Sequence, residues 1–243
     1  MSDKKLCLII GGSKGTGLVA AKHYLANGWE VVSASRNLPE KPADGIRFLT
    51  LKDSSSDSCR KVLNMLGQPV DAVIFSQKFR GAGDSWAGEL DTGMTLTKNM
   101  IETAADGFFA SKASVVIIGS AAQDFYAEEQ PVSYHAAKAA LAQMAVYYAN
   151  SLGKKGVRVN GILCGAVKKP ENTTYYEDEK MKKIYETISP LGRMCEAEDI
   201  AGAAFFLTGS SASYITGHVL KVDGGISTVS HESLVKKIWD IKR

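Results

Sequence analysis

The sequence lacks three features that would define a special class of protein: paired cysteines, long apolar runs and a secretory leader. Its 243 residues contain only four cysteines, which are widely separated and form no Cys-x-x-Cys pair. This favours reduced thiols and a cytoplasmic location over a disulfide-rich secreted protein. Apolar runs such as Leu6–Ile10 and Val115–Ile118 are too short to cross a bilayer, so no membrane association is expected. The start, Met1–Lys5, has no apolar stretch, which argues against export.

The sequence also has little net charge. A formal net charge of +3 with scattered lysines argues against a nucleic-acid partner. The hydrophobic fraction of 45% and the charged fraction of 23% are ordinary for a globular protein and exclude disordered and fibrous classes. The length favours a single domain over residues 1–243, of which residues 226–243 form a C-terminal tail. Glycine, in contrast, is abundant, with 23 residues.

Short β-branched runs alternate along the chain with longer helical stretches. Expected strands are Leu6–Ile10, Glu30–Ser35, Arg47–Leu51, Asp71–Phe75, Ser114–Ile118, Arg158–Leu163 and Val219–Val222. Expected helices are Gly17–Asn27, Ser56–Leu66, Thr92–Phe109, Val132–Leu152, Asn172–Ile188 and Ala197–Leu207. This alternation predicts an α/β fold with a doubly wound parallel sheet and helices on both faces. Lys78–Glu89 is typical of a linker, and Leu234–Trp239 predicts a short helix packed on the body or on a neighbouring subunit.

A glycine-rich turn lies between the first strand and the first helix. Glycines there let the backbone approach a diphosphate, and the helix N-terminus supplies N–H donors and a favourable dipole. The turn therefore predicts dinucleotide binding in a Rossmann fold, and an ordinary glycine-rich loop is the alternative. The candidate binding residues are Gly11, Ser13, Lys14, Gly15, Thr16 and Gly17.

The end of the second strand bears on the choice of dinucleotide. An acidic residue there accepts hydrogen bonds from the ribose 2′-hydroxyl and favours NAD, but the chain has Ser35 followed by Arg36. Arg36 and Lys14 can together hold a 2′-phosphate, which predicts NADP(H). The alternative is that both are solvated surface cations.

A tyrosine and a lysine with helical spacing form the candidate catalytic pair. Tyr134 and Lys138 stand at positions i and i+4, on one face of an expected helix. A nearby ammonium lowers a tyrosine pKa, so the pair can exchange a proton with a carbonyl or alcohol oxygen. A buried tyrosine next to a surface lysine is the alternative interpretation. Ser120 follows the buried run Val115–Ile118, at a strand end of the kind that carries active-site groups.

Together these motifs resemble the classical short-chain dehydrogenase/reductase family, from Leu6 to Gly225. The resemblance rests on the glycine spacing, on Tyr134-x-x-x-Lys138, and on the downstream blocks Ser189–Arg193, Glu196–Ala201, Tyr214–Gly217 and Val222–Gly225. It implies that Ser120 hydrogen-bonds the substrate oxygen, Tyr134 transfers the proton, and Lys138 holds the nicotinamide ribose. It also implies a homodimer or homotetramer formed through the long helices and the C-terminal strand.

The resemblance adds further cofactor residues. Ser35 occupies the place of the aspartate found in NAD-dependent members, and Asp53 that of an aspartate that contacts the adenine amino group. Helix capping is the alternative for Asp53. Gly165 and Val167, after the sixth strand, complete the expected cofactor site.

The sequence also departs from the family pattern on the cofactor side. The family's Asn-Asn-Ala-Gly is Phe75-Ser76-Gln77-Lys78 here, which predicts an altered cleft. Only Asp91 or Thr92 lies near the place of the family's relay asparagine, because Asn99 is too far along. The Pro-Gly motif is Cys164-Gly165, and Lys169 replaces a threonine that meets the nicotinamide.

These observations predict an NADPH-dependent carbonyl reductase, or the reverse alcohol dehydrogenase, that acts on a small-molecule carbonyl or alcohol. The lost family residues leave two alternatives open: a regulatory protein that binds NADP(H) without turnover, and a non-redox dehydratase or isomerase that uses Tyr134 as a base. No metal is expected, because the four histidines show no metal-binding spacing. The charged, aromatic run Lys169–Lys183 predicts a lid over a polar substrate.

Overall fold

The computed structural model describes residues 4–81 and 85–241. A seven-stranded sheet with the order β3-β2-β1-β4-β5-β6-β9 forms its centre, and every strand pair in it is parallel. The strands are β1 (Leu6–Ile10), β2 (Glu30–Ser35), β3 (Ile46–Thr50), β4 (Val70–Phe75), β5 (Phe109–Ile118), β6 (Arg158–Cys164) and β9 (Val219–Val222). The strand order reverses between β1 and β4, and open parallel sheets bind ligands at that point. The predicted doubly wound Rossmann fold is confirmed.

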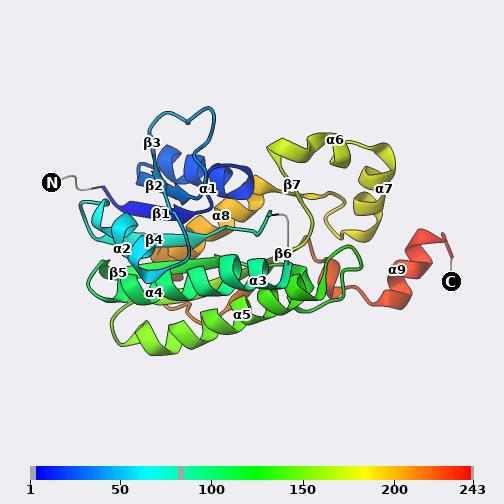
Figure 1. Ribbon diagram of the computed structural model, residues 1–243. Helices are drawn as coiled ribbons and strands as arrows, with labels where there is room; N and C mark the ends of the chain where they lie inside the picture. The colour runs from blue at the N-terminus through cyan, green and yellow to red at the C-terminus, as the bar shows by residue number, and fades with distance from the viewer. Residues whose placement is uncertain (1–3, 82–84, 242–243) are drawn as a thin grey trace.

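Helices cover both faces of this sheet (Figure 1). One face is covered by α1 (Gly15–Ala26) and α8 (Ala197–Thr208), which contact each other. The other is covered by α2 (Ser56–Asn64), α4 (Leu96–Ala105) and α5 (Val132–Gly153). Because both faces are covered, all five residues of β1 are buried, which explains why the strands are nearly continuous apolar runs.

The two layers of the core follow from the alternation of side chains along each strand. Leu6, Leu8 and Ile10 of β1 belong to the apolar cluster beneath α2, α4 and α5. Cys7 and Ile9 point to the opposite face and belong to the cluster beneath α1 and α8. Each strand therefore packs against both helical layers, and the sheet forms a rigid base for the loops at its carboxyl edge.

The segment between β4 and β5 differs most from the expected elements. The linker-like stretch 78–89 contains a one-turn helix, α3 (Ser85–Glu89), and its residues 82–84 lie outside the described part of the chain. The expected helix Thr92–Phe109 is wrong at both ends. It begins as a π-helical segment, Leu90–Thr95, that continues into α4, and Phe109 is the first residue of β5. One wide turn of this kind shifts the residues before it around the helix axis, and such turns are frequent at functional sites.

The predicted helix Asn172–Ile188 is also divided. A 3₁₀ turn (Pro170–Asn172) and α6 (Thr173–Tyr176) precede α7 (Glu179–Ile188). The division lies at Asp178, whose side chain accepts hydrogen bonds from the backbone N–H groups of Lys180 and Met181 and so begins a new helix. The helix α9 (His231–Ile238), predicted as Leu234–Trp239, contacts α7 (Figure 1).

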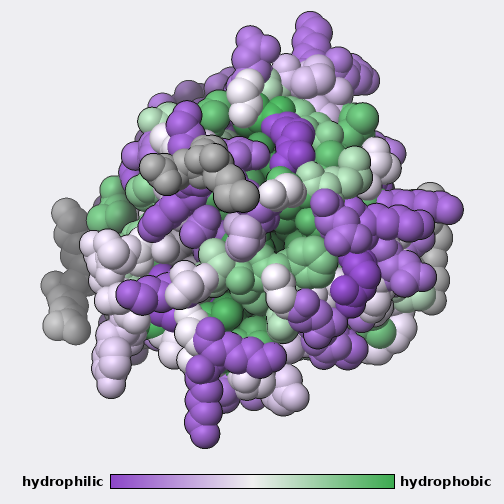
Figure 2. All heavy atoms as spheres, turned by 90° about the vertical axis from the view of Figure 1, so that its left-hand side faces the viewer, coloured by the Kyte–Doolittle hydropathy of each residue, from purple (hydrophilic) through white to green (hydrophobic). Residues whose placement is uncertain are grey.

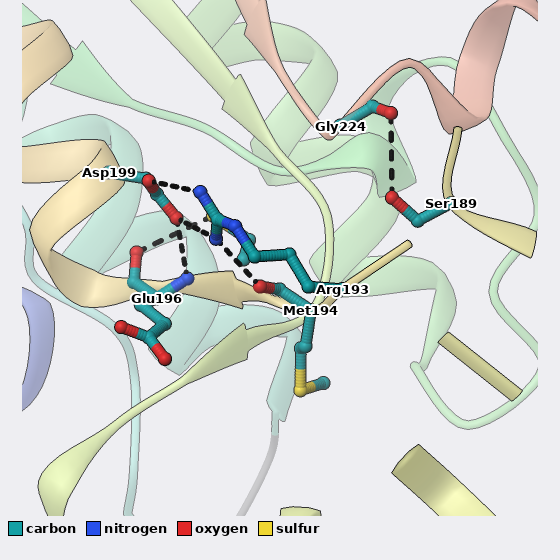
Figure 3. A network of polar contacts seen from close by, with 7 residues as sticks. Ser189, Arg193, Met194, Glu196, Asp199 and Gly224 are labelled. Carbon is teal, nitrogen blue, oxygen red and sulfur yellow. Dashed lines mark hydrogen bonds and ion pairs between the residues drawn. The ribbon is translucent and has the colours of Figure 1, made fainter. Parts of the chain in front are cut away.

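A polar network joins the short strand pair β7 (Val167–Lys168) and β8 (Cys195–Glu196) to α8 (Figure 3). Arg193 donates two hydrogen bonds, of 2.7 and 2.9 Å, to the carboxylate of Asp199. Asp199 also accepts from the backbone N–H of Glu196, and the Glu196 side chain completes a capping box. This network fixes the start of α8 and the strand pair next to it.

The face at the left of Figure 1, where the strands begin, shows apolar residues in the middle bordered by hydrophilic ones (Figure 2). Among the residues described, none of the helices combines the length and apolar character needed to cross a bilayer.

Candidate active site

A cleft of about 820 Å³ lies at the carboxyl ends of β1, β2 and β4, where the strand order reverses. Its lining includes eight of the residues predicted to bind the cofactor: Gly11, Ser13, Lys14, Gly15, Thr16, Ser35, Arg36 and Asp53. The predicted residues Gly17, Tyr134, Lys138, Gly165 and Val167 are not among the described residues that border this cleft. The cleft is large enough for a dinucleotide-sized ligand, since pockets for such molecules measure roughly 300–1,000 Å³.

The glycine turn brings backbone close to backbone. A Cβ on Gly17 would lie 2.4 Å from the carbonyl oxygen of Gly11, so only glycine fits there. Gly11 has a φ of +84°, a conformation that L side chains rarely adopt. Lys14 precedes α1 and makes no side-chain cap within the described residues, so the first N–H groups of α1 face the cleft without a capping side chain. These features fit a bound phosphate group.

The carboxylate of Glu171 lies over this turn. Its Oε1 is 2.6 Å from the position that a Cβ on Gly15 would take, and it forms an ion pair of 3.6 Å with Arg80. The segment between β7 and α6 therefore reaches across the cleft to the helix N-terminus, which agrees in position with the lid expected from Lys169–Lys183.

Two of the predicted residues, Ser35 and Arg36, lie at the end of β2 and line the cleft. The Ser35 hydroxyl oxygen is buried and has no hydrogen-bond partner within the described residues, and Ser35 lines the cleft. Buried polar atoms normally have a partner, so a ligand atom is the simplest one for this oxygen. Arg36 and Lys14 line the same cleft. Glu40, whose carboxylate was not among the predicted site residues, lines it as well.

Asp53 contributes to the local structure as well as to the cleft wall. Its carboxylate accepts hydrogen bonds from the backbone N–H of Ser55, at 3.0 Å, and from the Ser55 hydroxyl. These bonds lower the pKa of Asp53 to about 2. Ser55 in turn caps α2 by accepting from the N–H of Ser58. Asp53 therefore takes part in helix capping indirectly: it holds Ser55, the residue that caps α2.

The predicted catalytic residues lie together beside the cleft. Ser120 follows β5 and its hydroxyl hydrogen-bonds the hydroxyl of Tyr134 on α5. The Lys138 ammonium lies 5.4 Å from the centre of the Tyr134 ring, and Lys138 is only 6% exposed. The alternative of a surface lysine is therefore wrong. Ser133, next to Tyr134 in the sequence, donates a hydrogen bond of 3.3 Å to the Ser85 hydroxyl instead.

One electrostatic expectation is not met. The pKa of Tyr134 is raised above its usual value, chiefly by burial, while the hydrogen bond with Ser120 acts in the opposite direction. From the sequence, the Lys138 ammonium was expected to lower this pKa. The physical reason is the burial of the hydroxyl, the largest influence on this pKa, because burial disfavours the charged phenolate.

Three further charged residues surround Tyr134, none of which was predicted as a site residue. The Lys78 ammonium lies 4.7 Å from the centre of the Tyr134 ring, and Lys78 and Lys169 both line the cleft. The carboxyl group of Glu89 is buried at 7% exposure and interacts with Lys138 and Lys78. Burial raises the pKa of Glu89, and the two lysines oppose that rise. The sequence already shows Lys78 and Lys169 in the place of family residues. The position of Glu89, in contrast, depends on the π-helical segment Leu90–Thr95 that follows it.

The predicted residues near the relay position have other contacts. Asp91 accepts a hydrogen bond from the Ser54 hydroxyl, and the Asn99 amide donates to the backbone oxygen of Ser54 at 2.8 Å. Thr92 is buried. On the far side, Gly165 lies next to Asp223, and Val167 is buried in the core. Within the described residues, no group of three or more His, Cys, Asp or Glu side chains is arranged to hold a metal ion.

The chain is similar to a protein family and to several individual proteins. A family model described as enoyl-(acyl carrier protein) reductase matches residues 79–227. The chain is 26% identical to a 3beta-hydroxysteroid dehydrogenase 1 from Eggerthella lenta, over 92% of the chain and 94% of that protein. It is 30% identical to an uncharacterized oxidoreductase of Schizosaccharomyces pombe, over 92% of the chain and 91% of that protein.

A solved structure has the same fold. A blue fluorescent protein from a metagenomic library, crystallised in complex with NADPH, superposes with a TM-score of 0.77 at 22% identity, over 92% of this chain and 98% of that one.

Proposed function

The chain belongs to the short-chain dehydrogenase/reductase family, and on that premise we propose that it is an NADP(H)-dependent carbonyl reductase or alcohol dehydrogenase. The observation that carries the proposal is the cluster of Ser120, Tyr134 and Lys138 at the end of a cleft whose glycine turn fits a phosphate. The relatives' names support an oxidoreductase, since two of them are called a dehydrogenase and an oxidoreductase.

The residues of the cleft fit a 2′-phosphorylated dinucleotide. The orphaned hydroxyl of Ser35 and the cations of Lys14 and Arg36 border one end of the cleft, and a guanidinium fork suits a phosphate dianion. Gly11 and Gly17 allow the close approach of a diphosphate, with the N-terminus of α1 beneath it. When bound, NADPH supplies the hydride that reduces the carbonyl carbon.

The side chains of this protein manage the proton and the carbonyl oxygen. Tyr134 donates its hydroxyl proton to the oxygen as negative charge develops there. Ser120, already within hydrogen-bond reach of that hydroxyl, donates a hydrogen bond to the same oxygen and stabilises the charge. Lys138 holds the ribose next to the nicotinamide. The overall reaction consumes a carbonyl compound, NADPH and one proton, and it releases an alcohol and NADP⁺.

The proposal is tested by removal of the Tyr134 hydroxyl. Purified protein is mixed with NADPH and a panel of ketones that includes acetoacetyl-coenzyme A and a 3-oxosteroid, and the loss of reduced nicotinamide is followed by absorbance. Tyr134→Phe should lower kcat by at least about 10²-fold, the contribution typical of a positioned acid, with the Kd for NADPH unchanged. Tyr147→Phe, on the exposed face of the same helix, is the matched control and should retain full activity.

The cofactor preference is tested in the same assay. NADPH should bind at least tenfold more tightly than NADH, and Arg36→Ala should reduce that difference. Unchanged turnover in Tyr134→Phe would contradict the assignment of the acid. Tight NADPH binding without turnover of any ketone would favour the regulatory alternative, and an isomerised or dehydrated product without net cofactor oxidation would favour the non-redox one.

A further inference from the structure

Among the residues that the structure describes, cationic side chains outnumber acidic ones near the proposed catalytic tyrosine. The ammonium groups of Lys78 and Lys138 lie 4.7 and 5.4 Å from the centre of the Tyr134 ring. Lys169 interacts electrostatically with both of these lysines. Glu89 is the carboxylate that interacts with Lys78 and Lys138. Among the described residues, two ammonium groups therefore lie over one phenol ring, with one carboxylate that interacts with both of them.

This excess of positive charge affects the lysines themselves. The pKa of Lys138 is lowered chiefly by burial, and Lys78 and Lys169 lower it further by repulsion. The pKa of Lys78 is lowered by partial desolvation and then by repulsion from Lys169, while Glu89 opposes the change. Like charges gathered in a partly desolvated site destabilise one another, and a bound anion relieves that repulsion.

We propose that the carbonyl substrate carries an anionic group, a carboxylate or a phosphate, and that Lys78 binds it. This inference rests on the proposed function, because it names the class of substrate that the reductase site takes. Lys78 is suited to the role because it touches Tyr134 on one side and borders the open cleft on the other. Lys78 is also exposed, whereas Lys138 is buried, so the Lys78 ammonium is the more accessible of the two to a substrate.

The phosphates of the cofactor do not account for this cluster. The glycine turn offers its own donors to a diphosphate at the N-terminus of α1, and Lys14 and Arg36 lie at the β1 and β2 side of the cleft. Arg80, the other cation near Lys78, is paired with Glu171. The Lys78 ammonium, next to Tyr134, is therefore not needed for the phosphates of the cofactor, and it lies beside the residue proposed to protonate the carbonyl oxygen.

Matched pairs of charged and neutral ketones test the inference. The pairs are acetoacetate with ethyl acetoacetate, and dihydroxyacetone phosphate with dihydroxyacetone. Their Kd values are measured by calorimetry on the chain saturated with NADP⁺, which allows binding without reduction, and kcat/KM is measured with NADPH. At least one charged ketone should bind tenfold or more tightly than its neutral partner, since a hydrogen bond to a charged group typically contributes about that factor or more.

Variants of Lys78 then assign the effect to the side chain. Lys78→Met, which keeps length and removes charge, should abolish most of the difference between charged and neutral partners, and Lys78→Arg should retain it. Lys168→Met is the control, because Lys168 is paired with Glu177 and does not border the cleft among the described residues. Thermal melting of each variant confirms that it folds. The pair with the larger difference tells whether the anion is a carboxylate or a phosphate.

The outcomes separate this inference from the proposed function. Reduction of the neutral ketones with no preference for their charged partners leaves the reductase proposal standing and overturns the inference, as does a preference that survives in Lys78→Met. Charge-selective binding that depends on Lys78, without oxidation of NADPH by any ketone, supports the anion site and overturns the reductase proposal.

Discussion

At the residue scale, the protonation of Tyr134 decides which direction of the proposed reaction this side chain can catalyse at a given pH. Burial raises the pKa of this hydroxyl above its usual value near 10, so Tyr134 is protonated at neutral pH. A protonated tyrosine is the form that donates to a carbonyl oxygen, whereas oxidation of an alcohol needs the phenolate. The buried hydroxyl therefore favours reduction at neutral pH.

The rate of each direction should depend on pH accordingly. We expect kcat/KM for ketone reduction to stay level through neutral pH and to fall only where Tyr134 loses its proton, at a pH above the ordinary range for tyrosine. For alcohol oxidation with NADP⁺ we expect the opposite, a rise toward high pH. Stopped-flow or steady-state rates between pH 6 and the limit of stability measure both profiles. A reduction rate that falls between pH 6 and 8 would show that the tyrosine pKa is lowered in the complex with cofactor.

Gly17 allows a second prediction at this scale. Because a Cβ at this position would meet the Gly11 carbonyl oxygen at 2.4 Å, Gly17→Ala should distort the glycine turn. We expect a loss of about 1–3 kcal/mol in the free energy of unfolding, the usual cost of overpacking, and at least tenfold weaker NADPH binding. Urea unfolding and calorimetry measure the two effects.

Gly202→Ala is the matched control for Gly17→Ala. Gly202 lies inside α8 with no heavy atom beyond its own helix within 4 Å of an added Cβ, so alanine should stabilise the helix by up to about 1 kcal/mol. Equal effects of the two substitutions would contradict the close approach of the glycine turn.

The residues that define the proposed site were predicted from the sequence to different degrees. Ser120, Tyr134 and Lys138 come from motifs with fixed spacing, and the structure brings all three together. Glu89 was missed because its place beside Lys138 depends on the π-helical segment that follows it, and regular helical spacing does not anticipate such a turn. The expected effect of Lys138 on the Tyr134 pKa was wrong for a related reason: sequence spacing places a side chain on a helix face but does not show how deeply the hydroxyl is buried.

At the scale of elements, the N-terminus of α8 depends on a small polar network. Asp199 accepts a hydrogen bond from the N–H of Glu196 and two from the Arg193 guanidinium (Figure 3). The side chain of Arg193 is 52% exposed, so the ion pair itself contributes little, and the cap contributes the larger share. Asp199→Ala should therefore destabilise the protein by about 1–2 kcal/mol, measured by urea unfolding.

The same network predicts a pH dependence. The hydrogen bonds from Arg193 hold the pKa of Asp199 below its ordinary value near 3.9. The stability that they supply is thus present above that unfolded-state pKa and is lost as the pH falls through the lowered, folded-state pKa. The difference in unfolding free energy between wild type and Asp199→Ala should shrink in acid. Glu198→Ala, in the same first turn but exposed, should change stability by less than about 0.5 kcal/mol at any pH.

Most elements were predictable from the sequence because helices cover both faces of the sheet. The strands are therefore continuous apolar runs, which are easy to distinguish from amphipathic helices. The bounds of β1, β2 and β9 match the prediction residue for residue. The errors lie where local capping or a wide turn overrides the apolar pattern. Asp178 divides one expected helix by capping α7, and the start of β5 at Phe109 shortens another.

At the scale of the whole molecule, the alternation of strands and helices determined the topology. Right-handed crossovers between parallel strands leave few possible strand orders, so the sheet and the location of the cleft at its carboxyl edge followed from the sequence. A single domain, a cytoplasmic location and a particular number of subunits stay predictions. The number of subunits is the one for which the surface offers a direct test.

Exposed apolar side chains on α5 fit a contact with a second copy of the chain. Tyr147 is 63% exposed on this long helix, and Val146 next to it is exposed as well, at the outer side of the layer that covers the sheet (Figure 1). Uncovered apolar groups on a regular helix commonly mark an interface, and most such assemblies are symmetric dimers or tetramers. We therefore expect a mass of two or four times 26.1 kDa by light scattering.

Tyr147→Glu should lower that mass, because it places two like charges across a two-fold axis in a desolvated contact. Tyr126→Glu is the control: Tyr126 is 84% exposed but lies in the loop after Ser120, where it stacks on His135 in the first turn of α5, about three turns of the helix before Tyr147. It should leave the mass unchanged. A wild-type mass of 26.1 kDa would contradict the predicted oligomer. A wild-type oligomer that Tyr147→Glu leaves intact would place the contact on another surface, such as the segment before the edge strand β9, where Tyr214 is fully exposed.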